Sequence, residues 1–182
     1  MMELDNIYNE DCLQGMRRME AESVDLTVTS PPYDNLRTYN GYCFDFENIA
    51  RELYRVTKQG GVIFVAYCMM DASILQFGFM KGNVQSLIDR GLLDPVTFRA
   101  SSTPAELFEL HRKEDIDALR SHFDVEQLHF VAADGYANHM RDTMAQMDDA
   151  TFDIYLRYHF ATCERPDMIG LSHHTLDIFR KN

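Results

Sequence analysis

Four consecutive residues, Ser30-Pro31-Pro32-Tyr33, carry the clearest chemistry in this chain. They follow residues 24–29, an apolar run rich in β-branched side chains that predicts a buried strand. Proline cannot donate to a sheet ladder, so the two prolines end the strand in a rigid turn. The Ser30 side chain and the Pro31 carbonyl can accept hydrogen bonds from an NH2 group, and the Tyr33 ring can stack on a flat heterocycle. A flipped-out nucleobase is recognised by both kinds of contact.

With these residues, the segment 6–62 resembles the N-terminal part of an amino-methylating DNA methyltransferase, of the class in which the catalytic motif precedes the cofactor motif. The catalytic tetrapeptide of that family is Asp, Asn or Ser, then Pro-Pro, then Tyr, Phe or Trp, and Ser30, Pro31, Pro32 and Tyr33 match it in full. The upstream stretch 6–13 fits as well. The resemblance implies that these four residues are catalytic, and that Asp11 and Cys12 lie against the adenine of S-adenosylmethionine.

The tetrapeptide and Asp11 can also be interpreted as purely structural features with no role in catalysis or cofactor binding. The tetrapeptide can be an ordinary turn at the end of a strand, with Tyr33 half buried. Asp11 can be the N-cap of a helix over residues 13–19, because aspartate is a favoured N-cap residue. The structural and the functional interpretation of Asp11 are compatible with each other.

The charge of the chain bears on its partners. The net charge is −12 at pH 7, and both residues 1–62 (net −5) and the remainder (net −7) are acidic. Lysine and arginine supply most non-specific affinity for DNA, so this composition disfavours DNA binding by the chain alone. The four cysteines are scattered without a Cys-x-x-Cys pair, which is typical of a reducing cytoplasm and argues against a zinc ribbon. No apolar stretch approaches the ~20 residues of a membrane span.

Strands and helices are expected to alternate in the first third of the chain. Residues 7–8, 24–29 and 62–67 predict strands, and residues 13–19 and 46–57 predict helices. Beyond them, residues 73–79, 103–110, 113–123, 139–147 and 150–164 predict helices, and residues 127–132 and 175–179 predict strands, the last as an antiparallel edge. Alternating strands and helices favour a parallel sheet with right-handed crossovers.

The second part of the chain carries a different resemblance. Residues 60–182 resemble the C-terminal half of a class I S-adenosylmethionine-dependent methyltransferase of the small-molecule type. The stretches that carry it are 55–62, 128–131, 138–141 and 158–179. The two resemblances meet at Gly60-Gly61-Val62, a helix–glycine–strand step that both families share, so the pattern indicates a chimera joined at an equivalent point of one fold.

The glycine-rich cofactor turn of these families is missing. None of the nine glycines forms Gly-x-Gly, so the methionine carboxylate of the cofactor lacks its usual cradle of backbone N–H groups. His159, Cys163, Glu164, His173 and His174 can be drawn as a zinc site. However, His159 and Cys163 belong to a core stripe of their helix, and adjacent histidines on a strand point to opposite faces. We therefore expect no metal.

The sequence predicts one α/β domain over residues 1–182 with a partial Rossmann-like sheet, mostly parallel, and helices on both faces. Residues 1–62 are its DNA-methyltransferase-like segment and residues 63–182 its class I segment. We expect a cytoplasmic methyltransferase that uses S-adenosylmethionine and acts on a nucleobase amine or a small molecule. The alternative is a catalytically inactive remnant, which pairs with another chain or a second copy through an exposed sheet edge.

Overall fold

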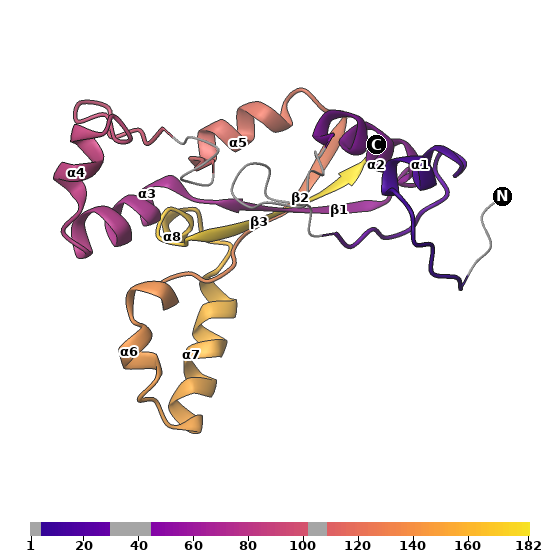
Figure 1. The fold of residues 1–182 in the computed structure, drawn as a ribbon. Coiled ribbons are helices and arrows are strands. Elements are labelled where there is room, and N and C mark those ends of the chain that lie inside the picture. Colours follow the sequence, from indigo (N-terminus) through magenta and orange to yellow (C-terminus); the bar gives the residue numbers. More distant parts are fainter. Residues whose placement is uncertain (1–4, 30–44, 102–108) are drawn as a thin grey trace. The chain divides into compact units, whose positions relative to one another are not determined.

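The computed structural model describes residues 5–29, 45–101 and 109–182 (Figure 1). It divides into two compact units. Unit 1 comprises Met1–Ile63, Asp124–Glu126 and Phe179–Asn182, and unit 2 comprises Phe64–Phe123 and Gln127–Ile178. The strands β1 (Val62–Cys68), β2 (Val125–Ala132) and β3 (His174–Lys181) each contribute residues to both units.

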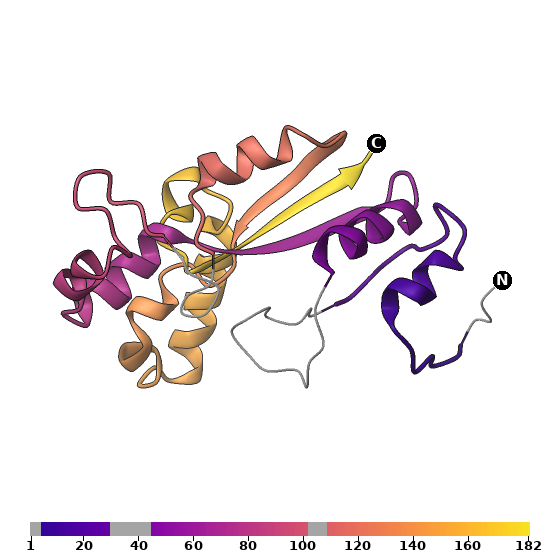
Figure 2. The same cartoon turned by 45° about the horizontal axis from the view of Figure 1, so that its top comes forward.

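The three strands form one sheet in the order β1-β3-β2 (Figure 2). Backbone bonds from Gly60 to Lys181 and from Met69 to His173 show that β1 runs antiparallel to β3. Bonds that join Ala133 to His174, and Asn182 to Asp124, show the same for β2. The prediction of a mostly parallel, Rossmann-like sheet is therefore wrong. The segment 175–179 is antiparallel as expected, but it lies in the centre of the sheet and not at its edge.

The parallel sheet fails because the two strands expected at its start do not form. Residues 7–8 have no regular structure, and residues 24–29 contribute only an isolated parallel bridge between Val24 and Thr57. Leu26 and Val28 are 62% and 87% exposed. Among the residues that the structure describes, no strand lies beside this apolar run, so it has no sheet in which to be buried.

Most helices lie where their periodicity places them. In unit 1, α1 spans Cys12–Arg17 and α2 spans Phe46–Val56. In unit 2 the helical elements are α3 (Met70–Ser73), the π-helix η2 (Ile74–Met80), α4 (Val84–Asp89), α5 (Lys113–Arg120), η3 (Ala137–His139), α6 (Arg141–Met144), α7 (Asp149–Thr162) and α8 (Pro166–Ile169). The expected helix over 103–110 falls mainly outside the described residues. Within the described part of the chain, no helix has the length and apolar character to cross a membrane.

Each unit has its own hydrophobic interior. In unit 1, α1 packs on α2 around Met16, Ile49 and Val56. In unit 2 one cluster gathers Met69, Ile116, Phe130, Ala132 and Ile169, and a second gathers Met70, Ile74 and Leu93. These small separate clusters take the place of the single core that one parallel sheet would have provided.

Lys181, at the end of β3, anchors the C-terminus of α2 in unit 1. Its side chain is only 8% exposed, and its Nζ donates to the carbonyls of Tyr54 at 3.0 Å and Thr57 at 2.9 Å. The ammonium also lies 4.5 Å from the centroid of the Tyr54 ring. A cation suits this position, because the last carbonyls of a helix carry partial negative charge and lack partners within the helix.

We expect Lys181→Met to lower the free energy of unfolding by about 1–3 kcal/mol, because two carbonyls lose a buried charged donor. The measurement is urea unfolding followed by circular dichroism. Lys58→Met is the matched control, because Lys58 pairs with Asp25 at 2.6 Å on the surface, where the side chains are 45% and 80% exposed. Such a pair contributes at most about 1 kcal/mol. Equal losses in the two variants would contradict the anchoring role.

Candidate functional site

Asp11 and Cys12 lie together at the start of α1, and both are exposed. The Asp11 carboxylate accepts hydrogen bonds from the backbone N–H groups of Leu13 at 3.0 Å and Gln14 at 3.1 Å. Asp11 is therefore the N-cap of α1, which confirms the structural interpretation of this residue. Its expected contact with a cofactor, and that of Cys12, stay predictions.

Arg55 of α2 holds α1 in place. Its guanidinium donates to the carbonyls of Met16 at 2.7 Å and Met19 at 3.0 Å, which lie at the C-terminal end of α1. Glu52 fixes the orientation of the guanidinium with bonds of 2.6 and 2.9 Å. The positive charge of Arg55 thus compensates the negative end of α1, while Asp11 compensates the positive end.

Ser30, Pro31, Pro32 and Tyr33 lie outside the described residues. The structure does describe residues 24–29, which precede the tetrapeptide. Val24 forms a bridge with Thr57, and residues 25–29 are exposed. The expectation that a buried strand would present the tetrapeptide at the carboxyl edge of a parallel sheet is therefore not met.

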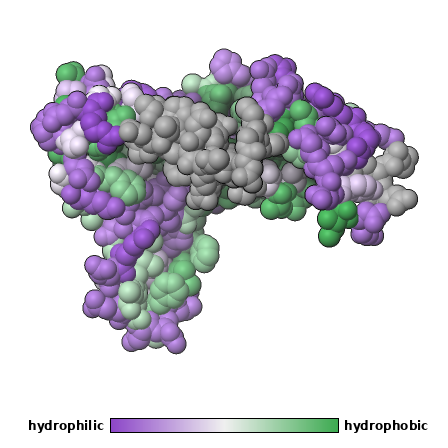
Figure 3. Space-filling view, in the orientation of Figure 1, coloured by the Kyte–Doolittle hydropathy of each residue, from purple (hydrophilic) through white to green (hydrophobic). Residues whose placement is uncertain are grey.

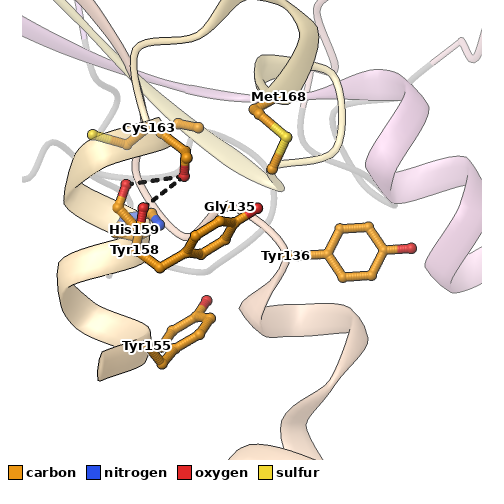
Figure 4. A pocket seen from close by; sticks show the side chains of 9 residues that line it. Gly135, Tyr136, Tyr155, Tyr158, His159, Cys163 and Met168 are labelled. Carbon is orange, nitrogen blue, oxygen red and sulfur yellow. Dashed lines mark hydrogen bonds between the residues drawn. The ribbon is translucent and has the colours of Figure 1, made fainter. Parts of the chain in front are cut away.

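Unit 2 contains a small pocket between α7 and the residues that follow β2 (Figure 4). Its volume is about 20 Å³, which is close to the space that one water molecule occupies. Gly135 borders it with φ +52°, and a Cβ at this position would come within 2.9 Å of the His159 ring. The lining consists of Ala132, Gly135, Tyr136, Tyr155, Tyr158, His159, Thr162, Cys163 and Met168. A nucleoside does not fit into this pocket in its present form.

Beside the pocket, Asp134 ties the end of β2 to the start of β3. Its carboxylate accepts hydrogen bonds from the Ser172 hydroxyl and from the His174 backbone N–H at 3.1 Å, and it pairs with the His174 ring at 2.9 Å. Burial by itself would raise the pKa of Asp134, but these bonds outweigh it and hold the pKa below the ordinary value of 3.8. The carboxylate is therefore a structural anion.

His173 is 5% exposed, and its Nε2 has no hydrogen-bond partner within the described residues. Burial lowers the pKa of this imidazole, because the charged form would lose its hydration. The ring of His139 lies 5.3 Å away, with its own Nε2 directed at the Leu171 carbonyl. These contacts indicate a neutral histidine in the interior of unit 2.

The side chains that the sequence offers as zinc ligands contact different partners. Glu164 pairs with His129 at 3.0 Å, His174 pairs with Asp134, and His159 and Cys163 line the pocket. Over residues 5–29, 45–101 and 109–182, no three His, Cys, Asp or Glu side chains form a group that could hold a metal ion.

The network of Asp134 and Ser172 is not predicted by the sequence. The pair Asp134-Gly135 suggested only the end of a strand, and nothing in the sequence links it to a serine 38 positions later. The one available signal was an aspartate directly after an apolar strand, a position where a carboxylate often bonds to the backbone of the next turn.

Comparison with known proteins gives one partial relative. No family model matches the chain. A stretch of 41 residues is 73% identical to the orphan methyltransferase M.BamHII of Bacillus amyloliquefaciens. The matched stretch amounts to 22% of this chain and 16% of that protein. The chain thus contains a methyltransferase-related segment.

We expect Asp134→Asn to destabilise the chain by about 1–2 kcal/mol at pH 7, because a charged acceptor of several hydrogen bonds becomes neutral. The pKa of Asp134 is lower in the folded chain than in the unfolded chain. Its contribution to the free energy of unfolding is therefore fully present above its pKa in the unfolded chain, and is lost as the pH falls through its pKa in the folded chain. The variant should therefore lose less stability than the parent as the pH falls below the ordinary carboxyl pKa of 3.8.

Urea unfolding at a series of pH values measures this difference. Asp142→Asn, at an exposed position in the first turn of α6, is the control. Parallel pH profiles for the parent and Asp134→Asn would contradict the assignment.

Proposed function

We propose that this chain takes part in methyl transfer from S-adenosylmethionine to an exocyclic amine of a nucleobase in DNA. The observation that carries the proposal is the 73% identity to an orphan methyltransferase over 41 residues. The resemblance of Ser30-Pro31-Pro32-Tyr33 to the catalytic tetrapeptide of amino-methylating DNA methyltransferases supports the choice of acceptor.

The role of the tetrapeptide in this reaction is to position the acceptor amine. The Ser30 side chain and the Pro31 carbonyl accept hydrogen bonds from the amine, which directs the nitrogen lone pair away from the turn. Pro32 keeps the turn rigid, and Tyr33 stacks on the base. When bound, the cofactor would supply an electrophilic methyl group on a sulfonium: the S–C bond would break as the N–C bond forms, S-adenosylhomocysteine would leave, and the proton lost by the amine would pass to water. Holding the amine in line with that group accounts for the rate without a covalent intermediate on the protein.

The proposal assigns only part of the cofactor to the described residues. Asp11 and Cys12 are exposed at the start of α1, where an adenosine can reach them. For the methionine end, the chain offers no Gly-x-Gly turn whose backbone N–H groups could hold the carboxylate. We therefore assign the adenosine contact to unit 1 and no contact of this chain to the amino acid moiety.

An alternative function remains, in which the chain is inactive and serves as a partner of another protein. The incomplete cofactor site favours it, and so does the three-stranded sheet. Its outer strand β1 pairs with β3 on one side, and on the other side its last residue, Cys68, accepts a hydrogen bond from the His111 N–H at 2.9 Å; within the described residues no further strand pairs with β1. An edge of this kind can accept a strand from another chain. A chain that binds neither adenosine nor S-adenosylhomocysteine would favour this alternative.

Calorimetric titration tests the partial site directly. If only the adenosine moiety is held, adenosine and S-adenosylhomocysteine should bind with affinities within about threefold of each other, since the amino acid moiety adds no contact. Asp11→Ala should weaken both by about tenfold, which corresponds to roughly 1.4 kcal/mol.

The matched control is Asp45→Ala. Asp45 is the N-cap of α2 and accepts from the Asn48 N–H, so its loss removes a cap in the same unit without touching the proposed site. Asp11→Asn, which retains a capping side chain, separates the cap from the carboxylate charge. Equal weakening by Asp11→Ala and Asp45→Ala would overturn the assignment of Asp11.

Transfer of a labelled methyl group to duplex DNA tests the catalytic turn. Ser30→Ala and Tyr33→Ala should each lower the rate at least tenfold while adenosine binding is retained, because both residues act on the acceptor. A chain that methylates DNA equally well with either substitution would contradict the role of the tetrapeptide.

A further inference from the structure

Helix α7 of unit 2 exposes several large apolar side chains among charged ones. None of its fourteen residues is buried, and Ile154, Tyr158 and Phe160 are 59%, 55% and 73% exposed. The surface view shows hydrophobic residues among hydrophilic ones over the region of α6 and α7 (Figure 3). Water-exposed apolar groups of this size on one helix are typical of a contact surface.

The two sides of α7 have different neighbours. Tyr155, His159 and Cys163, at helical spacing, face the pocket and are wholly or partly buried. On the other side, Ala150, Ile154, Arg157 and Ala161 form an exposed stripe. Tyr158 lies between this stripe and the pocket, whose wall it also lines. We call this stripe the α7 face.

The spacing of the α7 face is symmetric. Its four residues are separated by four, three and four positions, so the stripe has the same spacing when it is followed in either direction. If two copies meet with their α7 helices antiparallel, Ala150 of one copy lies opposite the partner's Ala161. Ile154 then lies against the aliphatic part of the partner's Arg157. The small alanines at both ends allow the helix axes to approach closely, as self-complementary contact requires.

Charge decides between this arrangement and a parallel one. The N-terminal half of α7 and its cap carry Asp148, Asp149 and Asp153, while Arg157 lies in the C-terminal half. Asp153 and Arg157 form an ion pair of 3.1 Å within the helix, and both side chains are about 70% exposed, so they are accessible to a second copy. In the antiparallel arrangement, Arg157 of one copy lies level with the partner's Asp153. In the parallel arrangement, like charges and the like ends of the helix dipoles would meet.

We propose that the α7 face pairs antiparallel with the α7 face of a second copy of this chain. A contact formed by one helix of fourteen residues is smaller than a standard interface, so the dimer is weak, with a Kd of roughly 10–100 µM. The proposal is independent of the proposed methyl transfer, because its residues belong to unit 2 and not to the segment that contains Asp11 and Ser30.

Sedimentation equilibrium of the full chain over a range of concentrations tests the proposal. The mass-average value should rise from 21.1 kDa towards twice that value as the concentration passes the Kd. Arg157→Glu should raise the Kd about tenfold, because it places like charges against each other in both symmetric contacts. The double variant Asp153→Lys/Arg157→Glu restores opposite charges and should return the Kd to within about threefold of the parent.

Arg51→Glu on α2 is the matched control. Arg51 pairs with Glu47 at the same i, i+4 spacing, with side chains 73% and 75% exposed, so its substitution has the same effect on charge and on an intrahelical pair. It should leave the Kd unchanged. Circular dichroism verifies that every variant is folded, and Ile154→Ser gives a second, uncharged test of the same face.

Three outcomes would overturn the proposal. The first is a chain that stays monomeric up to about 1 mM, ten times the upper Kd above. The second is an equal effect of Arg157→Glu and Arg51→Glu, which would indicate repulsion through total charge. The third is a dimer that is insensitive to Ile154→Ser and Arg157→Glu, which would place the contact elsewhere, for instance at the edge of β1.

Discussion

The central strand β3 places three polar side chains in the interior, and all three depend on partners from distant parts of the chain. Asp177 is fully buried and is held by Arg120 at 2.9 Å and Gln127 at 2.8 Å. Thr175 donates to the sulfur of Met69, and Lys181 donates to the last carbonyls of α2. A buried charge without its partner costs several kcal/mol, and a shift of one residue would turn all three side chains to the opposite face. These contacts therefore fix both the place and the register of β3.

Both pairings in the sheet are antiparallel because both involve β3. β1 and β2 run in the same direction, but each pairs with β3, which runs the other way between them. The strand that completes the sheet consists of residues 174–181, at the end of the chain. Its first residues belong to unit 2 and its last ones to unit 1, so the polar contacts of β3 contribute to the stability of both units.

The residues with recognisable chemistry and the residues that hold the fold together are different sets. The structure gives Asp11 a place in the fold as the N-cap of α1, and its contact with a nucleoside belongs to the proposed function. Asp134 and Asp177 are committed to hydrogen bonds inside unit 2, and the aromatic pocket beside them holds no more than a water molecule. The chemical case for methyl transfer therefore rests on short motifs in the first 62 residues.

The sequence by itself determined the elements whose causes are local. The cap at Asp11, the amphipathic stripe of α2 and the β-branched run of β1 were all predicted, because their signals lie within a few residues of one another. The sheet order and the networks of Asp134 and Asp177 were decided by tertiary structure alone, since they join residues 38 to 57 positions apart. Residues 24–29 show the limit most clearly. An apolar β-branched run becomes a buried strand only where neighbouring strands cover it, and pairing partners are a property of the whole fold.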